Sequence, residues 1–213
     1  LGYRISSILT SVAGTSMLLL LVLTMVVSLI MGMGVPTTAA YLVLASLVAP
    51  TMIQLGIPPL AAHMFIFYFG CISSITPPVA LAAYAGAGLA GCDPNKTGYK
   101  AFRLAFCSFL MPYLFVYNPV LLMEGGVLDI LWSLVTALIG AYLLASGFEG
   151  FFFRWSLKWF ERPLMILGAV MLIVPGMVTD LVGIAIIVVE FVTEFMFKRS
   201  EKFVPVTVSQ STT

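Results

Sequence analysis

Two interruptions of long apolar runs constrain this chain most. Residues 32–38 read GMGVPTT and residues 73–78 read SSITPP, and both segments lie inside otherwise apolar stretches. Proline removes a backbone donor and clashes with the preceding turn, so neither stretch continues as one regular helix. Lipid offers no hydrogen bonds, so irregular backbone at membrane depth must be satisfied by protein or by a water-filled cavity. The two segments therefore predict broken membrane helices rather than plain anchors.

The composition places the whole chain in a membrane. Of its 213 residues, 61% are hydrophobic and 9% are charged, whereas globular domains carry about a quarter charged residues. The net charge of +1 gives no reason to expect a nucleic-acid partner. The three cysteines have the spacing of neither a disulfide framework nor a metal site. We expect an all-α integral membrane protein that needs no cofactor.

Segment lengths predict how the first part of the chain is built. A helix needs about 20 residues to cross a bilayer. The two apolar arms within 16–50 are each shorter than that, so this segment predicts a re-entrant helical hairpin with its tip at the first interruption. The segment 60–90 is too long for one spanning helix and predicts a helix broken at 73–78. With a spanning helix at 106–123, which Pro112 and Pro119 predict to be irregular, these elements form a predicted unit 1–124.

A second membrane module is predicted over 125–197, with extra transmembrane helices. The segment 148–162, FEGFFFRWSLKWFER, alternates aromatic and charged residues at helical spacing, which predicts an amphipathic surface helix. The apolar segment 164–192 is interrupted by VPGMVTD and predicts a second hairpin. A polar tail occupies 198–213. With the first hairpin entering from outside, nine of the ten Lys and Arg residues fall on the inner side, as the positive-inside rule requires.

The two interruptions also suggest a binding site. A helix end exposes carbonyl groups that suit a cation, and a helix start exposes N–H groups that suit an anion. Neighbouring hydroxyls add neutral oxygens, which hard cations prefer. Broken helices that meet near the midplane are the binding device of secondary transporters. The candidate substrate and ion-binding residues are Gly32, Gly34, Pro36, Thr37, Thr38, Ser73, Ser74, Thr76 and Pro77.

Several other readings of single residues are open. Both breaks could serve helix packing alone, in a non-transporting membrane scaffold or interaction subunit. An intramembrane hydrolase would use Ser73 or Ser74 with His63, but no orienting acid accompanies them, and we expect His63 to make a structural hydrogen bond. Asp93 is expected to cap a helix. Thr179 or Asp180 is expected to cap another helix, and Asp180 is not expected to relay protons. The sequence contains no set of residues that predicts an enzyme.

A family resemblance rests on the same segments. GMGVPTTAAYLVLASLVAP, followed by GIPPLAAHMFIFYFGCISSITPPVALAAYAGAGLAG, resembles the C-terminal half of the large membrane permease subunit of TRAP (tripartite ATP-independent periplasmic) transporters. It is most similar to the fused type that works with TAXI-class binding proteins. The resemblance covers about residues 1–123. Because the sequence opens at Leu1 without a start methionine, we expect the C-terminal part of a longer protein.

The resemblance implies a fold and a function. The fold would be the second half of an inverted repeat in an elevator-type ion transporter. The transporter would import organic anions, C4-dicarboxylates or related carboxylates, across the bacterial inner membrane, with Na⁺ as coupling ion. Its partners would be a periplasmic substrate-binding protein, the N-terminal half of the permease and a small membrane subunit. On this mapping the hairpin tip and the broken helix frame the second sodium site and one wall of the substrate site.

Overall fold

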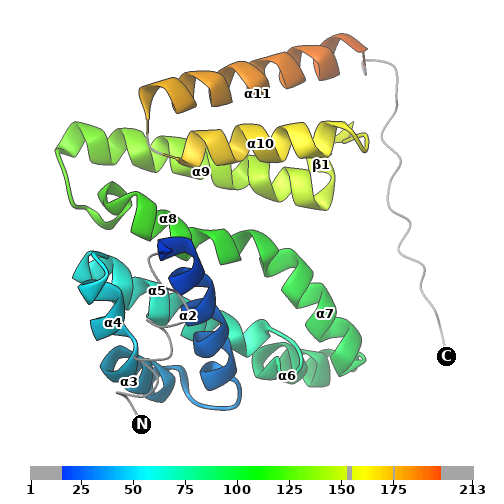
Figure 1. The fold of residues 1–213 in the computed structure, drawn as a ribbon. Coiled ribbons are helices and arrows are strands. Elements are labelled where there is room, and N and C mark those ends of the chain that lie inside the picture. Colours follow the sequence, from blue (N-terminus) through cyan, green and yellow to red (C-terminus); the bar gives the residue numbers. More distant parts are fainter. Residues whose placement is uncertain (1–15, 153–154, 175, 198–213) are drawn as a thin grey trace. The chain divides into compact units, whose positions relative to one another are not determined.

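The computed structural model describes residues 16–152, 155–174 and 176–197, and this part of the chain is mostly helical (Figure 1). The chain divides into two compact units, Leu1–Leu134 and Val135–Thr213. In chain order the elements are α2 (Met17–Gly32), α3 (Thr37–Leu47), α4 (Ala49–Gln54), α5 (Pro59–Ile72), the 3₁₀ turn η1 (Ser73–Ile75), α6 (Leu81–Ala90), α7 (Pro94–Ala105), η2 (Phe106–Leu110), α8 (Met111–Tyr117), η3 (Pro119–Leu122), α9 (Val127–Glu149), β1 (Phe151–Phe152), β2 (Trp155–Ser156), α10 (Glu161–Ile173) and α11 (Met177–Phe197).

Helix α5 is the centre of the first unit. Its sequence, PLAAHMFIFYFGCI, is apolar on nearly every side, and half of its residues are buried. Phe65 and Phe69 are completely buried. Helices α2, α3, α4 and α8 pack around α5 (Figure 1). Leu20 and Leu21 of α2 and Leu44 of α3 complete the same apolar core.

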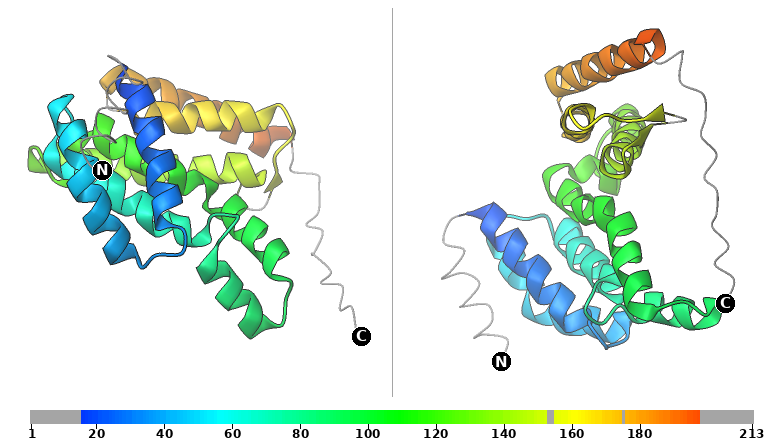
Figure 2. Two further views of the ribbon diagram at one scale, coloured as in Figure 1. Left: turned by 60° about the horizontal axis from the view of Figure 1, so that its bottom comes forward. Right: turned by 90° about the vertical axis from the view of Figure 1, so that its right-hand side faces the viewer.

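Helices α2 and α3 are the two arms predicted within 16–50. Ser16 caps α2 by accepting a hydrogen bond from the Leu19 backbone N at 3.4 Å. The two helices pack against each other and both contact α5 (Figure 2). The helical arms and the turn between them are present where the sequence predicts them. Entry of this pair into a membrane from one side stays a prediction.

Helix α7 begins as the sequence predicts. The Asp93 side chain accepts a hydrogen bond from the Lys96 backbone N at 2.9 Å, and Pro94 occupies the first helical position. A capping carboxylate and a proline at that position both favour a helix start. The Tyr84 ring of α6 lies against Gly98 of α7, where an added Cβ would approach it to 3.0 Å. The capping role of Asp93 is confirmed.

The prediction of one spanning helix over 106–123 is wrong. This range contains η2, α8 and η3, with Asn118 in a non-helical conformation at φ −133° and ψ 80°. Pro119 explains the second interruption, because a proline disfavours the helical region for the residue before it. Pro112 has no backbone N–H to donate at the start of α8, which helps to end the preceding 3₁₀ turn there.

Helix α9 spans the boundary between the two units. By length and composition it is the one helix in the described part of the chain that could cross a membrane by itself. Several shorter apolar helices accompany it, among them α2, α3 and α6.

The helices of the second unit pack closely at glycines. A Cβ on Gly140 of α9 would lie 3.1 Å from the Ala169 carbonyl oxygen of α10, and one on Gly183 of α11 would lie 3.0 Å from the Gly168 carbonyl oxygen. Small residues at these contacts let the helix backbones approach closely.

The predicted interruption of 164–192 is present. Helix α10 ends at Ile173 and α11 begins at Met177, and the two pack side by side (Figure 2). The Thr179 hydroxyl donates to the carbonyls of Val174 and Gly176 at 2.9 and 2.7 Å. Asp180 is buried in the first turn of α11 and is not its cap. The capping prediction for Asp180 is wrong because the helix starts earlier than expected. The predicted tail 198–213 lies outside the described residues.

The prediction of an amphipathic helix over 148–162 is also wrong. Helix α9 stops at Glu149 because Gly150 takes a left-handed conformation, with φ +78°. Glycine adopts this conformation readily and is the usual residue just past a helix end. Two short antiparallel strands follow, with Phe151 opposite Ser156. The Leu157 backbone N then donates to the Gly150 carbonyl at 2.8 Å. Aromatic residues favour strands, and Phe151 and Phe152 form the first of these two strands before α10.

Candidate functional site

The first helix break lies between α2 and α3. Helix α2 ends at Gly32, and the Met33 N–H donates to the Ile30 carbonyl at 3.3 Å. Gly34 then has φ +82°, which side chains rarely tolerate. Pro36, with φ −54°, precedes the first residue of α3. The chain thus reverses within residues 33–36, and the reversal depends on the glycine and the proline that the sequence places there.

The second break separates α5 from α6. Helix α5 tightens into the 3₁₀ turn η1, and Thr76 leaves the helical region with φ −98° and ψ 124°. Pro77 and Pro78 follow, joined by a cis peptide bond. Ala80 has φ +34°, although it is not a glycine, and is completely buried. A left-handed backbone at a residue other than glycine, as at Ala80, persists only where the surrounding structure holds it, and such residues are concentrated at functional sites.

The two breaks touch each other. A Cβ added to Gly32 would lie 2.8 Å from the Ser73 Cβ and 3.3 Å from the Gly70 carbonyl oxygen. A Cβ on Gly70 would lie 3.9 Å from the Thr37 methyl group. The end of α2 and the start of α3 therefore lie against the last turn of α5. Glycine at position 32 is what allows this approach, because any side chain there would meet Ser73.

The hydroxyls of the second break all donate in one direction. Ser73 donates to the Gly70 carbonyl at 2.6 Å, Ser74 to the Cys71 carbonyl at 2.7 Å, and Thr76 to the Ile72 carbonyl at 2.8 Å. The expected free carbonyls at the end of α5 are therefore partly occupied. A hydroxyl has one proton and two acceptor lone pairs. With each proton committed to α5, the three oxygens keep lone pairs with which a cation could be bound.

The helix starts beside the breaks carry no side-chain caps. Neither Pro36, which precedes α3, nor Ala80, which precedes α6, accepts a hydrogen bond from the first turn through its side chain. The first N–H groups of a helix have no partner inside the helix and form a positive end. Two such ends next to the hydroxyl cluster are chemically suited to a carboxylate.

The remaining predicted residues lie at the edge of this arrangement. Gly34, Pro36 and Thr38 are exposed, and no atom lies within 4 Å of the position that a Gly34 Cβ would take. Thr37 and Pro77 are half-buried. Gly32, Ser73 and Thr76 are buried. The structure therefore brings Gly32, Thr37 and Ser73 together around Gly70, and it leaves the tip of the first turn open.

Two polar residues of α2 were not predicted. Thr24 and Ser28 are completely buried, and their hydroxyl oxygens have no hydrogen-bond partner among the described residues. They precede Gly32 by eight and four residues, so all three lie on one face of α2. The spacing of four residues between Thr24, Ser28 and Gly32 is the signal in the sequence that the three share a helix face. It points to the site only once Gly32 is known to face the second break.

His63 is placed away from the breaks. Its Nδ1 lies 3.1 Å from the Tyr41 hydroxyl oxygen, so the expected structural hydrogen bond is present. Ten residues separate it from Ser73 along α5 and η1, which is about 15 Å at the helical rise. Ser73 and Ser74 donate to backbone carbonyls instead. This geometry gives no support to a serine hydrolase.

Comparison with known proteins identifies the family. Residues 1–130 match the family described as "Tripartite ATP-independent periplasmic transporter, DctM component". No curated protein and no solved structure matches the chain. The matched region is more than half of the 213 residues and contains both helix breaks. The chain therefore belongs to the DctM family, the integral membrane permease component of TRAP transporters, which is a transporter family and not an enzyme family.

Proposed function

We propose that this chain is the second-repeat half of a sodium-coupled TRAP permease that imports organic anions. The substrates are C4-dicarboxylates or related carboxylates, handed over by a periplasmic binding protein of the TAXI type. The N-terminal half of the permease supplies the opposite wall of the site, and a small membrane subunit completes the assembly. The membrane is the bacterial inner membrane. Membership of the DctM family and the motifs of residues 1–123 support this proposal.

The contact between Gly32 and Ser73 carries the proposal. The end of α2 lies against Ser73, and Gly70 lies beside Thr37 at the start of α3. Sodium is a hard cation, and the neutral oxygens of Ser73, Ser74 and Thr76 resemble the shells that hard cations select. The substrate carboxylate would lie at the uncapped start of α3 or α6, where unpaired N–H groups favour negative charge.

A scaffold without transport has one observation in its favour. Hydroxyls that donate to the carbonyl three or four residues earlier are common in kinked helices, and all three hydroxyls of the second break do so. On that view the breaks only shape the packing of α5. The two functions differ in what removal of a hydroxyl oxygen does to ion dependence, and this difference defines the test.

The test is sodium-dependent uptake by the complete transporter reconstituted in vesicles. Thr38→Val combined with Thr76→Val removes one hydroxyl from each break and keeps the side-chain shape. We take the contribution of a hydrogen bond to a charged group, about 1.5–3 kcal/mol, as the scale for one oxygen that coordinates the ion, and 1.4 kcal/mol is about tenfold in affinity. The sodium concentration for half-maximal uptake should therefore rise at least about tenfold. Thr97→Val is the matched control, because the Thr97 hydroxyl donates to the Asp93 carbonyl at 2.9 Å, outside both breaks.

The outcomes separate the two functions. A sodium requirement that moves in the double variant and stays constant in Thr97→Val supports the ion site. A double variant with unchanged sodium dependence and a lower unfolding temperature supports the scaffold and contradicts the ion site. The unfolding temperature is measured on the same purified proteins, so loss of folding is not mistaken for loss of ion binding.

A further inference from the structure

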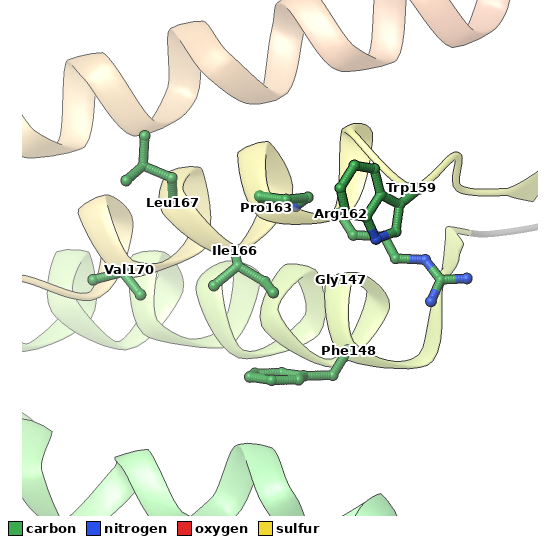
Figure 3. Close-up of a pocket in the computed structure, with 8 residues that line it drawn as sticks. All are labelled: Gly147, Phe148, Trp159, Arg162, Pro163, Ile166, Leu167 and Val170. Atoms are coloured by element: carbon green, nitrogen blue, oxygen red, sulfur yellow. The ribbon is translucent and has the colours of Figure 1, made fainter.

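A cavity in the second unit is lined by residues that have no part in the proposed transport site. It lies between the end of α9 and the first half of α10, with a volume of about 480 Å³ (Figure 3). This is within the size range of ligand pockets, about 300–1,000 Å³. Its lining residues are Gly147, Phe148, Trp159, Arg162, Pro163, Ile166, Leu167 and Val170. All of them follow residue 130, where the match to the DctM family ends.

Arg162 is the charged residue of this lining. Its Nε atom is buried and has no hydrogen-bond partner within the described part of the chain. The guanidinium lies directly against Gly150, and a Cβ there would come within 2.7 Å of Nε. The glycine thus makes room for the guanidinium beside the end of α9. A buried N–H group without a partner is costly, and an anion oxygen that reaches Nε would remove that cost.

The rest of the cavity, beyond Arg162, is lined by apolar side chains. Ile166 and Val170 follow Arg162 at intervals of four residues, so they extend from the charge along one face of α10 (Figure 3). By the helical rise, Val170 lies about 12 Å along the axis from Arg162. A charged end followed by an apolar groove fits a ligand with an anionic head and a hydrocarbon chain.

The rim has the character of a membrane interface. Trp159 is 88% exposed, and the neighbouring Phe160 and Phe151 are 66% and 61% exposed. Tryptophan is enriched at the headgroup level of bilayers. Lys158 adds an exposed cation close to Trp159 in the sequence. The cationic loop between α9 and α10 is predicted to be on the inner side, where the leaflet is rich in anionic lipids.

We propose that this cavity binds one anionic phospholipid of the inner leaflet. The phosphate accepts hydrogen bonds from the Arg162 guanidinium, Trp159 packs at the headgroup, and an acyl chain follows Ile166, Leu167 and Val170. Arginine suits this role because its planar fork matches phosphate oxygens and stays charged at all relevant pH values. The bound lipid would fasten the loop between α9 and α10 to the membrane surface.

The experiment uses the full chain, purified in detergent and titrated with defined lipids while native mass spectrometry counts the bound molecules. Phosphatidylglycerol is expected to bind at least about tenfold more tightly than phosphatidylcholine, because only the former carries a net negative head. Arg162→Met should reduce phosphatidylglycerol binding at least about tenfold. Lys158→Met, which removes an exposed cation outside the lining, should change it less than about threefold. Val170→Trp should fill the apolar end of the cavity. It should weaken the binding of phosphatidylglycerol without abolishing the binding of glycerol 3-phosphate.

Several results would overturn the proposal. Equal affinity for phosphatidylcholine would remove the requirement for negative charge. Saturation by inorganic phosphate at the same concentrations would make the ligand a free anion rather than a lipid. An unaffected Val170→Trp variant would place the acyl chain elsewhere. Should Arg162→Met fail to fold, the comparison of the two lipids on the unchanged protein, together with Val170→Trp, decides the question alone.

Discussion

Replacing Gly32 by alanine tests whether the two breaks must touch. The new Cβ would lie 2.8 Å from the Ser73 Cβ and 3.3 Å from the Gly70 carbonyl oxygen. Ser73 has little freedom to move, because it is buried and its short side chain is held by the Gly70 carbonyl at 2.6 Å. The end of α2 must therefore retreat from η1.

The size of the effect follows from this geometry. The 2.8 Å separation is about 0.6 Å short of the 3.4 Å at which ordinary van der Waals contact begins. Overpacking of a close contact costs about 1–3 kcal/mol, and the better helix propensity of alanine returns at most about 1 kcal/mol. We expect Gly32→Ala to lower the free energy of unfolding by about 1–2 kcal/mol. If the retreat costs the ion site about as much, sodium affinity falls about tenfold, since 1.4 kcal/mol is a factor of ten.

Two measurements are needed, unfolding in detergent and the sodium dependence of uptake by the complete transporter. Gly86→Ala is the matched control, because Gly86 is also helical and no atom lies within 4 Å of its added Cβ. It should be neutral or stabilising by up to about 1 kcal/mol. Combining Gly32→Ala with Ser73→Gly removes the Ser73 side chain from the clash and should recover part of the lost stability.

The reasoning is refuted if Gly32→Ala and Gly86→Ala behave alike in both measurements. It is also refuted if Ser73→Gly leaves the Gly32→Ala defect unchanged, because the loss would then not come from the contact between the breaks. A variant that loses stability but keeps its sodium dependence would separate the packing role of Gly32 from ion binding.

Two further predictions concern backbone conformation and capping. Ala80 and Ala87 are both completely buried, but only Ala80 has a left-handed backbone, which costs an L-residue about 1–2 kcal/mol. In thermal unfolding, Ala80→Gly should therefore be at least about 1 kcal/mol less destabilising than Ala87→Gly, and equal losses would contradict the strain. Asp93→Ala should destabilise α7 by about 1 kcal/mol, seen as faster amide exchange in its first turn, while Asp93→Asn should retain the cap.

Features set by local chemistry were predictable from the sequence. The break after Gly32 follows from a glycine that can take positive φ and a proline that fixes the next helix start. The break at Pro77 follows from two consecutive prolines that cannot donate. The Asp93 cap likewise depends on residues within one turn. Each of these signals acts over a few residues, so no knowledge of the tertiary structure was needed.

Features that depend on the rest of the fold were not predictable in the same way. The segment 148–162 has helical spacing of aromatic and charged residues, but the conformation of Gly150 ends α9 first, and the two strands then pair. Pro112 and Pro119 indicate an irregular helix within 106–123, but they do not predict its division into η2, α8 and η3. For the candidate site, the contact of Gly32 with Ser73 and the burial of Thr24 and Ser28 arise only from the packing of α2 against α5.

The absence of charge around the hydroxyls of Ser73, Ser74 and Thr76 has a consequence for how the proposed ion and substrate depend on each other. Residues 32–38 and 73–80 contain no acidic or basic side chain, so the wall that they form in the proposed site is electrically neutral. A lone sodium ion would bring an uncompensated charge into a weakly polarisable interior, and so would a lone carboxylate, which is unfavourable in either case. Arriving together, the two charges cancel. On this view, charge balance alone makes co-transport obligatory: this wall of the site lacks charged side chains, and no moving part of the protein is needed to couple the ion to the substrate.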